Sequence, residues 1–291
     1  MNANAPNLSQ LRVVRDHNRA FAEYLYVYPV ISRRSRGLSL GVNLNPDKRC
    51  NFDCIYCEVD RRTPPRTTVL DVPRMRAELR DLIGRVKRGE LAGLGKFAEA
   101  PELTQDIKDI AFSGDGEPTM IPNFSECVQA VVEVKLAEGL TRTKIVLITD
   151  AAGLDKADVR RGLALMDQHQ GEVWGKLDAG TEAYYRLINR SPVAFARILK
   201  NLGETARVRP IVIQSLFLRV HGQVMPPAEL EAYCERLNEL VRQGAQLKEV
   251  HAYTVARPTP EPFAAALTAA ELEAIAQTIR QRTGLVVHSF P

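Results

Sequence analysis

The eight residues CNFDCIYC (50–57) contain three of the five cysteines of this 291-residue chain, in the spacing C-x3-C-x2-C. Structural zinc sites and most iron–sulfur sites take four protein ligands. Three thiols on one short segment therefore indicate one of two arrangements. Either a fourth ligand comes from elsewhere in the chain, or the metal centre keeps an open position. No histidine lies close to the cysteines in sequence; the five are His17, His169, His221, His251 and His288.

The composition, 45% hydrophobic, allows a large buried core. No stretch approaches the roughly 18 consecutive apolar residues that a membrane-spanning helix needs. The first twenty residues lack an apolar segment, so we expect no signal peptide. An odd number of scattered cysteines argues against a disulfide framework. These features lead us to expect a cytoplasmic protein.

The charge is unevenly distributed along the chain. Residues 1–100 carry 18 Lys and Arg against 11 Asp and Glu, and the remainder carries 21 against 24. Basic clusters bracket the cysteines: Arg33-Arg34-Ser35-Arg36, Lys48-Arg49, Arg61-Arg62 and Arg66. They are consistent with a solvated basic face or with a mouth that attracts an anionic substrate or RNA. The clusters lack interleaved aromatic residues, which favours the solvated face.

Short β-type runs alternate with longer helical ones. We predict strands at 38–44, 109–114, 144–150, 173–178, 210–220 and 249–255. We predict helices at 71–90, 122–138, 155–166, 181–202 (split near Ser191-Pro192), 226–243 and 268–282. Six βα units predict an α/β fold, a partial (β/α)6 TIM-like barrel with a parallel sheet in a single domain.

We place this domain at residues 37–291, after an N-terminal extension at 1–36 in which residues 16–27 are expected to form a helix. Residues 284–290 could add a terminal strand. The cysteines follow the first predicted strand, and the loops at the carboxyl ends of barrel strands are where such folds carry out chemistry. The residues between the cysteines do not look like core, which speaks against a chance cluster of buried thiols.

Three thiolates can hold three irons of a cubane cluster and leave the fourth iron open. With Tyr56 before the last cysteine, the motif resembles that of the radical S-adenosylmethionine (SAM) superfamily. The resemblance implies a 4Fe–4S cluster on Cys50, Cys54 and Cys57, with SAM on the open iron and Tyr56 among the residues that bind SAM. It also implies an external one-electron reductant of the flavodoxin or ferredoxin type. Reductive cleavage of SAM would give methionine and a 5′-deoxyadenosyl radical that attacks the substrate.

A second motif follows the second predicted strand. In SGDGEPT (113–119), Asp115, Gly116, Glu117 and Pro118 match the superfamily's Gly-Gly-Glu-Pro motif, with Asp in place of the first Gly. The resemblance implies that this turn binds the SAM amino group. Glycine lets a backbone approach a ligand closely, and an acidic side chain complements an ammonium group.

Four segments resemble, more narrowly, the small radical SAM proteins related to wyosine-type tRNA-modifying synthases: CNFDCIYC, FSGDGEPT, KLDAGTEAYYRLINR and YTVARPTPEP. This implies RNA as the first substrate class to test, with a small anionic metabolite or a peptide as the alternative. A non-catalytic iron–sulfur or zinc-binding module is the competing class of protein.

Alternation along the predicted strands adds candidates for the cavity. Trp174, Lys176 and Asp178 share one strand face. Lys176 and Asp178 are expected to point into the mouth, where they are candidates for binding the SAM ribose hydroxyls or the substrate. Either Gln214 or Ser215 should face inward with a partner, because an unsatisfied polar group is costly to bury. We take Gln214, with Thr149, as a candidate for SAM binding. Tyr253 and Arg257 join Lys176 as catalytic candidates. The lone Cys127 and Cys234 are expected to be ordinary helix thiols.

Overall fold

The computed structural model describes residues 19, 21–60 and 63–291. Its centre is an eight-stranded sheet in the order β1-β2-β3-β4-β5-β6-β8-β10. Within this sheet, all strands after β1 run parallel to one another, and β1 pairs antiparallel with β2. The strands are β1 (Val27–Ser32), β2 (Gly37–Val42), β3 (Ile107–Phe112), β4 (Lys144–Thr149), β5 (Gly171–Lys176), β6 (Ile211–Leu216), β8 (Leu247–Tyr253) and β10 (Val287–Phe290). A small separate sheet pairs β7 (Arg219–Val220) with β9 (Ala264–Ala265).

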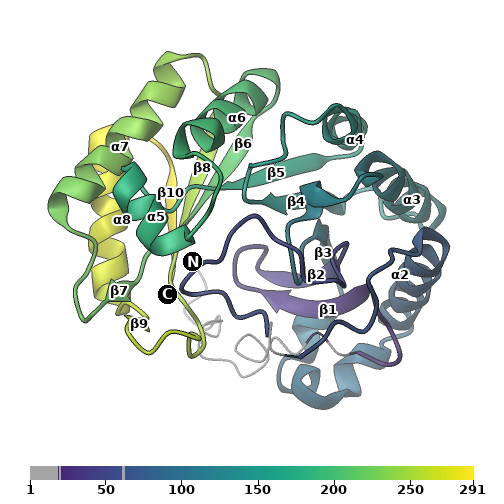
Figure 1. Cartoon of the computed structure of the whole chain (residues 1–291). Coiled ribbons are helices and arrows are strands. Elements are labelled where there is room, and N and C mark those ends of the chain that lie inside the picture. The colour runs from purple at the N-terminus through teal and green to yellow at the C-terminus, as the bar shows by residue number, and fades with distance from the viewer. Residues whose placement is uncertain (1–18, 20, 61–62) are drawn as a thin grey trace.

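Each strand from β2 to β8 is followed by helix on the outer face of the curled sheet (Figure 1). The helices are α2 (Val72–Lys87), α3 (Phe124–Ala137), α4 (Ala157–Asp167), α5 (Glu182–Asn189), α6 (Phe195–Val208), α7 (Pro227–Arg242) and α8 (Ala269–Thr283). Short 3₁₀ turns η2 (Glu90–Gly93), η3 (Gly95–Glu99) and η4 (Pro101–Thr104) lead into β3, and η5 (Pro118–Met120) precedes α3. The predicted partial barrel of six βα units is confirmed, as is the terminal strand.

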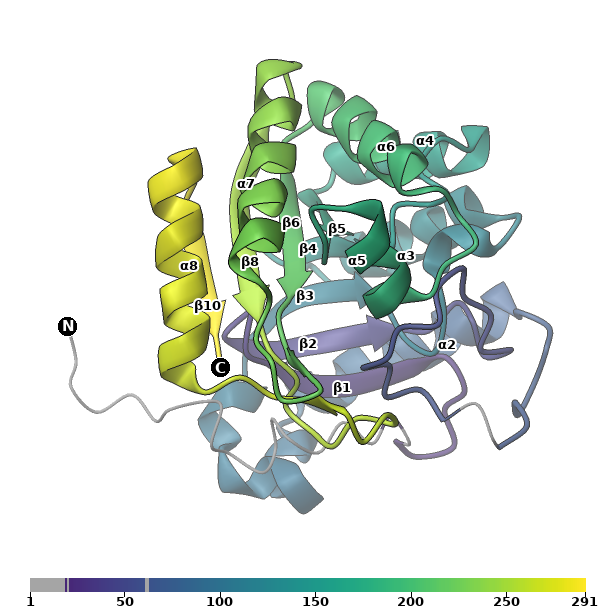
Figure 2. The same cartoon turned by 60° about the vertical axis from the view of Figure 1, so that its left-hand side comes forward.

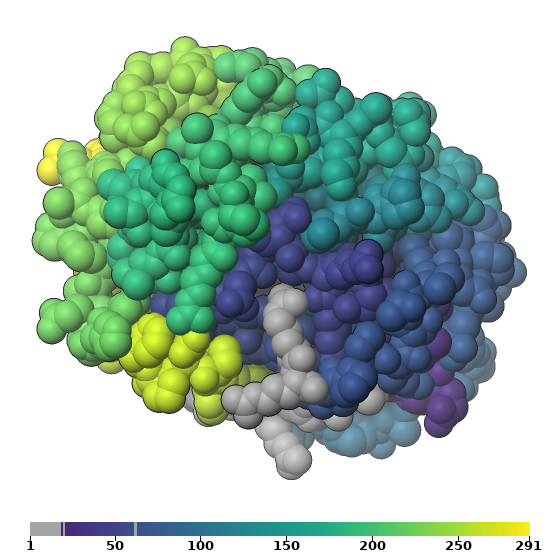
Figure 3. All heavy atoms as spheres, viewed as in Figure 1, coloured from purple at the N-terminus to yellow at the C-terminus, as the bar shows by residue number. Residues whose placement is uncertain are grey.

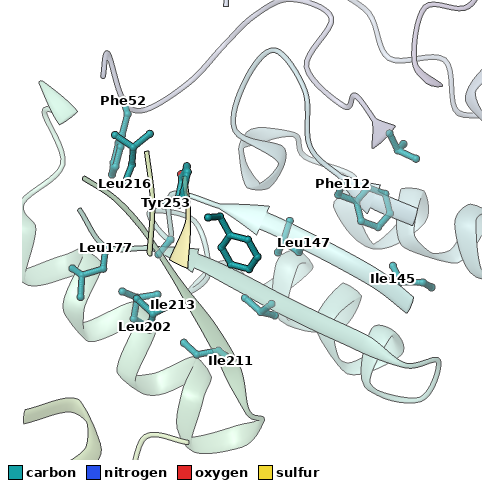
Figure 4. Close-up of a cluster of buried hydrophobic side chains, with 14 of the residues drawn as sticks. Phe52, Phe112, Ile145, Leu147, Leu177, Leu202, Ile211, Ile213, Leu216 and Tyr253 are labelled. Atoms are coloured by element: carbon teal, nitrogen blue, oxygen red, sulfur yellow. The ribbon is translucent and has the colours of Figure 1, made fainter. Parts of the chain in front are cut away.

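The outward strand residues form the main core against the helices. Ile145 and Leu147 of β4, and Ile211 and Ile213 of β6, are almost completely buried there (Figure 4). Local signals fix the helix ends. The Asp71 side chain accepts a hydrogen bond from the amide of Arg74 at the start of α2, and Thr268 and Glu271 form a capping box on α8. The outer layer therefore follows from apolar patterning and capping chemistry.

The N-terminal part of the sheet differs from expectation. The sequence pattern predicts no strand before residue 37, whereas Val27–Ser32 forms the edge strand β1. Pro29 speaks against a strand in sequence, yet an edge strand tolerates a residue without an N–H. In the expected helix over 16–27, residues 16–18 and 20 lie outside the described residues. Residues 21–26 contain turns and bends, so the helix prediction is wrong there.

The two edges of the curled sheet approach each other. In Figure 2, β1 and β2 lie across the direction of β6, β8 and β10. The turn between β1 and β2 thereby reaches the end of β10. The Arg33 guanidinium donates hydrogen bonds to the carbonyl oxygens of Phe290 (3.3 Å), Pro291 (2.6 Å) and Thr254 (3.4 Å). This side chain ties the first strands to the last. Among the described residues, no helix is long and apolar enough to cross a membrane.

Candidate metal and cofactor site

A cavity lies on the concave side of the sheet. Its lining includes the cysteine loop (residues 50–57), residues 113–117 after β3, and residues 148–150 at the end of β4. Strand side chains that point inward complete the wall: Ser39, Asp109, Ala111, Trp174, Lys176, Gln214 and Tyr253. In the space-filling view, the purple and blue atoms of the N-terminal third lie between the green and teal helical layers (Figure 3).

Backbone hydrogen bonds hold the cysteine loop against the end of α5. The amides of Asp53 and Ile55 donate to the carbonyl oxygens of Asn189 and Ile188, both at 3.0 Å. The Ser191 hydroxyl donates to the Asn51 carbonyl oxygen at 3.0 Å. A loop fixed at several backbone positions can present its thiols in one arrangement, which a metal site requires.

The residues between the cysteines are core residues, contrary to the sequence-based expectation. Phe52, Ile55 and Tyr56 are all buried, and the Phe52 ring meets the Tyr185 ring edge-on with centroids 5.5 Å apart. The apolar members of the motif thus anchor the loop, while the sulfurs of Cys50, Cys54 and Cys57 line the cavity.

Burial favours the protonated form of two of the thiols. It raises the pKa of Cys50 to about 12, with a further contribution from the Asp150 carboxylate. It raises the pKa of Cys54 to about 11, although Lys176 opposes the shift. Because metals bind thiolates, a metal centre here would have to displace these protons.

Tyr56 stands at the centre of a buried hydrogen-bond network. Its hydroxyl donates to Asp178 and accepts from the Lys176 ammonium at 3.0 Å. Asn189 donates to the other side of the network, at 2.9 Å to Asp178 Oδ2 and 3.4 Å to Cys54 Sγ. The network links β5 and α5 directly to the cysteine loop.

Asp178 and Lys176 differ in position and environment. Asp178 does not line the cavity, so the expectation that it points into the mouth is wrong; it lies behind Tyr56 and accepts from the Leu216 amide at 2.9 Å. Lys176 does line the cavity. Burial opposes its charge, but nearby Tyr253, Asp178 and the cysteines outweigh burial and raise its pKa. Lys176 is therefore a cation at neutral pH.

The turn after β3 packs directly against the cysteine loop. A Cβ atom on Gly116 would lie 1.9 Å from the Arg49 carbonyl oxygen, so only glycine fits without displacement. The Glu117 amide donates to the same oxygen at 2.9 Å. Asp115 accepts from Arg19 and, at 2.7 Å, from Asn43. Gly116 therefore allows the two loops to meet.

The Glu117 carboxylate is buried and bonded within the protein. Its Oε1 accepts from the hydroxyls of Thr119 and Thr149, both at 2.6 Å, and its Oε2 accepts from the Asp150 amide at 2.7 Å. Glu117 and Thr149 thus join the ends of β3 and β4 at the cavity wall.

Some buried polar atoms in the cavity wall have no partner among the described residues. They are both amide atoms of Gln214 and Oδ2 of Asp150. Ser215 on the opposite face bonds the Leu177 carbonyl oxygen and the Tyr233 hydroxyl, each at 2.6 Å. Gln214 is therefore the residue that faces inward, and it has no partner among the described residues, whereas the sequence predicted an inward residue with one. Unpaired polar atoms at a cavity wall are suited to a polar ligand.

The third group of candidates lies at the end of β8 and in the loop that follows it. Tyr253 lines the cavity, and Arg34 lies over its ring at 5.0 Å from the centroid. Arg257 also lines the cavity and forms an ion pair with Glu58, one residue beyond the last cysteine. This pair connects the loop after β8 to the cysteine loop.

The donor set fits the implied groups. Three sulfurs on one anchored loop suit a cluster in which each thiolate bonds its own iron, and the unpaired Gln214 and Asp150 atoms suit a polar cofactor beside it. In the described part of the chain, no three His, Cys, Asp or Glu side chains gather around a single metal-ion position. A cubane does not require that convergence, because its irons occupy separate corners.

Several residues at the site gave no usable signal in the sequence. Asn189 is the last residue of α5, in a stretch of sequence that indicated only a break between two helices. Asn43 and Arg19 contact Asp115 although both are distant from it in the sequence. Arg34 stood out only as one member of a basic cluster. Their roles depend on tertiary contacts, which no local pattern encodes.

No family model matches the chain. It is 26% identical over 182 residues to a protein named GTPase Obg of Brachyspira hyodysenteriae, covering 62% of this chain and 23% of that protein. It is 29% identical over 165 residues to a UPF0026 protein of Methanocaldococcus jannaschii, covering 56% of this chain and 43% of that protein. The chain thus spans less than half the length of these two relatives.

Among solved structures, Streptococcus suis SuiB, crystallised with S-adenosylmethionine, has a similar fold. The TM-score is 0.53 at 10% identity, over 88% of this chain and 48% of SuiB. At 10% identity this likeness concerns the fold alone. The resemblance to the radical SAM superfamily lies in the cysteine motif. At the level of sequence, it is similar to the UPF0026 proteins.

Proposed function

We propose that this protein is a radical SAM enzyme. Cys50, Cys54 and Cys57 would hold a 4Fe–4S cluster, and SAM would lie beside it against residues 115–117, Thr149 and Gln214. When bound and reduced, the cluster supplies the electron that splits SAM into methionine and a 5′-deoxyadenosyl radical.

One observation carries the proposal. The cysteine loop follows the carboxyl end of β2 and presents its three thiols to an interior cavity whose wall also contains unpaired polar atoms of Gln214 and Asp150. A purely structural metal knuckle has no need of such a cavity. Open coordination beside a cavity with polar walls suits a cofactor that binds the metal directly.

The protein's own residues have distinct parts in this scheme. Tyr56, held by Asp178 and Lys176, fixes the cysteine loop from behind. The Lys176 cation faces the cysteine side of the cavity, where it offsets the negative charge of bound thiolates. The Arg257–Glu58 ion pair joins the loop after β8 to the cysteine loop at the cavity wall.

The test is SAM cleavage by the anaerobically reconstituted protein with dithionite. We expect 5′-deoxyadenosine from the wild type and none from Cys54→Ala, because the cluster loses a ligand. Cys127→Ala is the matched control, since that thiol is buried in α3 outside the cavity lining. Intact SAM, together with an EPR signal that SAM does not alter, would instead favour a non-catalytic metal-binding module.

The substrate proposal places RNA first and a small anionic metabolite or peptide second. RNA is supported by the resemblance of four sequence segments to wyosine-type synthases and by the excess of basic residues in the first third of the chain. The experiment is mass spectrometry of tRNA nucleosides and small metabolites from a deletion strain. A missing modified nucleoside would support RNA, whereas an unchanged tRNA profile with an accumulated acid would support the alternative.

A further inference from the structure

The cavity extends well beyond the cysteine side. Ser39, Asp109 and Trp174 line it from positions early in or midway along their strands, whereas the cysteine loop lies past the carboxyl end of β2. Three residues separate Ser39 from the end of that strand, which corresponds to about 10 Å at the usual rise. The cavity therefore continues from the cysteine side to an inner end, lined in part by Ser39, Asp109 and Trp174, that the proposed cluster and SAM contacts do not use.

Arg34 occupies this inner end. It lies in the turn between β1 and β2, lines the cavity, and places its guanidinium over two aromatic rings. The guanidinium carbon is 5.0 Å from the Tyr253 ring centroid and 5.7 Å from that of Trp174. Stacking on the rings fixes the cation without consuming its N–H donors, because cation–π contacts involve the faces of the groups.

Arg34 forms no hydrogen bond or ion pair with any described residue. Other cations along the cavity are paired: Arg19 with Asp115, Arg257 with Glu58, and Lys176 with Tyr56. Asp109 also lines the inner end, but it accepts from Ser39 and does not approach Arg34 within ion-pair distance. Arg33, beside Arg34 in sequence, is occupied by three backbone carbonyl oxygens.

We propose that Arg34, framed by Trp174 and Tyr253, binds an oxyanion of the substrate, a carboxylate or a phosphate, at the inner end of the cavity. A guanidinium presents paired donors that match either oxyanion. The bound anion would orient the substrate with its remaining part toward the cysteine side. The role in a substrate rests on the function proposed above, but the anion site itself does not.

The molecule carries its own reporter for this site, because Trp174 is the only tryptophan in the chain. The experiment titrates the full-length protein with sodium acetate and, separately, with inorganic phosphate at constant ionic strength set by chloride. Tryptophan fluorescence and calorimetry follow binding. A saturable response is expected; a stronger response to acetate identifies a carboxylate site and a stronger response to phosphate a phosphate site. No saturable response to either anion would overturn the proposal.

Variants separate the site from general charge effects. Arg34→Gln should weaken anion binding about tenfold or more, because charge-assisted hydrogen bonds are lost. Arg36→Gln, the same charge change at an exposed residue of the same turn, should bind as the wild type does. Asp109→Asn removes the nearby negative charge and should tighten binding, which tests the site even if Arg34→Gln folds poorly. Equal affinities in all four proteins would contradict the proposal.

The outcome is independent of the enzyme assay, since the titration needs neither SAM nor reductant. Anion binding without SAM cleavage would leave the anion site standing and reject the proposed function. SAM cleavage without anion binding would leave the proposed function standing and reject the anion site.

Discussion

Tyr56 shows how a single side chain joins the cysteine loop to the barrel. Its hydroxyl contacts Asp178 and Lys176, and Asn189 reaches both Asp178 and Cys54. Burial, with the Asp178 carboxylate next in weight, raises the pKa of Tyr56 well above its usual range, so the hydroxyl keeps its proton as a donor. The position of Cys54 therefore depends on residues from β5, from the loop after β5 and from α5.

His251 is a second residue whose buried environment has a measurable consequence. Its Nε2 lies 2.8 Å from Glu249 Oε1, its ring meets Trp174 edge-on, and Arg34 and His288 are close enough to disfavour a positive charge. Burial is the largest contribution and outweighs the Glu249 carboxylate, which opposes the shift, so the pKa of His251 is lowered from 6.5 to about 4. The folded protein thus keeps this imidazole neutral.

The direction of the pH effect follows from that shift. Between about pH 4 and 6.5 the unfolded chain binds a proton at His251 that the folded protein does not. The free energy of unfolding should therefore fall as the pH drops through this window, by up to about 3 kcal/mol from this residue. His251→Gln should flatten that slope in denaturant titrations at pH 4.5, 5.5 and 6.5. His169→Gln, on the turn before β5, should retain the wild-type slope; equal slopes in all three proteins would refute the explanation.

At the scale of elements, the hydrophobic pattern predicted the barrel units closely. Each strand and each helix buries one apolar face, and the spacing of the apolar residues in the sequence differs between strands and helices. The split of residues 181–202 at Ser191-Pro192 is confirmed by the end of α5 at Asn189 and the start of α6 at Phe195. Patterns failed where tertiary context decides. The alternation of side chains between the two faces of the sheet does not extend to Asp178, because β5 ends at Lys176. β1 is held by its pairing with β2 rather than by its own sequence pattern.

The site was predictable to a lesser degree than the fold. The cysteines and residues 115–117 form short motifs, so the sequence placed them at the correct loops. The packing role of Gly116 was visible only in the structure. A side chain at this position would clash with the carbonyl oxygen of Arg49, which is more than sixty positions away in the sequence. Contacts between distant loops have no local signature.

The close approach of these two loops gives a direct test. Gly116→Ala should push the cysteine loop away from the turn after β3, because the added methyl would meet the Arg49 carbonyl oxygen and the Asn45 side chain. We expect iron content and visible absorbance after reconstitution to fall several-fold, while circular dichroism stays close to that of the wild type. Gly93→Ala is the control, since no atom lies within 4 Å of its added Cβ. Full iron loading of Gly116→Ala would show that the packing is not needed.

At the scale of the whole molecule, the barrel is open between its edge strands, and the β1–β2 turn partly closes that opening. Arg33 makes the connection by donating to three carbonyl oxygens at the ends of β8 and β10. Burial and the neighbouring Arg34 lower the pKa of Arg33 to about 10, so it still carries its charge at neutral pH. The same turn thus positions Arg34 in the cavity and holds the last strand in place.

This coupling predicts that the last strand loosens when Arg33 is removed. Among the residues that the structure describes, β10 pairs only with β8 and has no second neighbouring strand to hold it. Arg33→Ala would leave three carbonyl oxygens without their donor, at a cost of about 1–3 kcal/mol each if they stay dry. Amide exchange should therefore become faster in β10 and at the end of β8, and remain unchanged in β4 and β5 at the centre of the sheet. Arg36→Ala, in the same turn but exposed, should exchange as the wild type does. Uniformly faster exchange in Arg33→Ala would mean that the residue stabilises the fold globally, and unchanged exchange would mean that the edges of the barrel are held by other contacts.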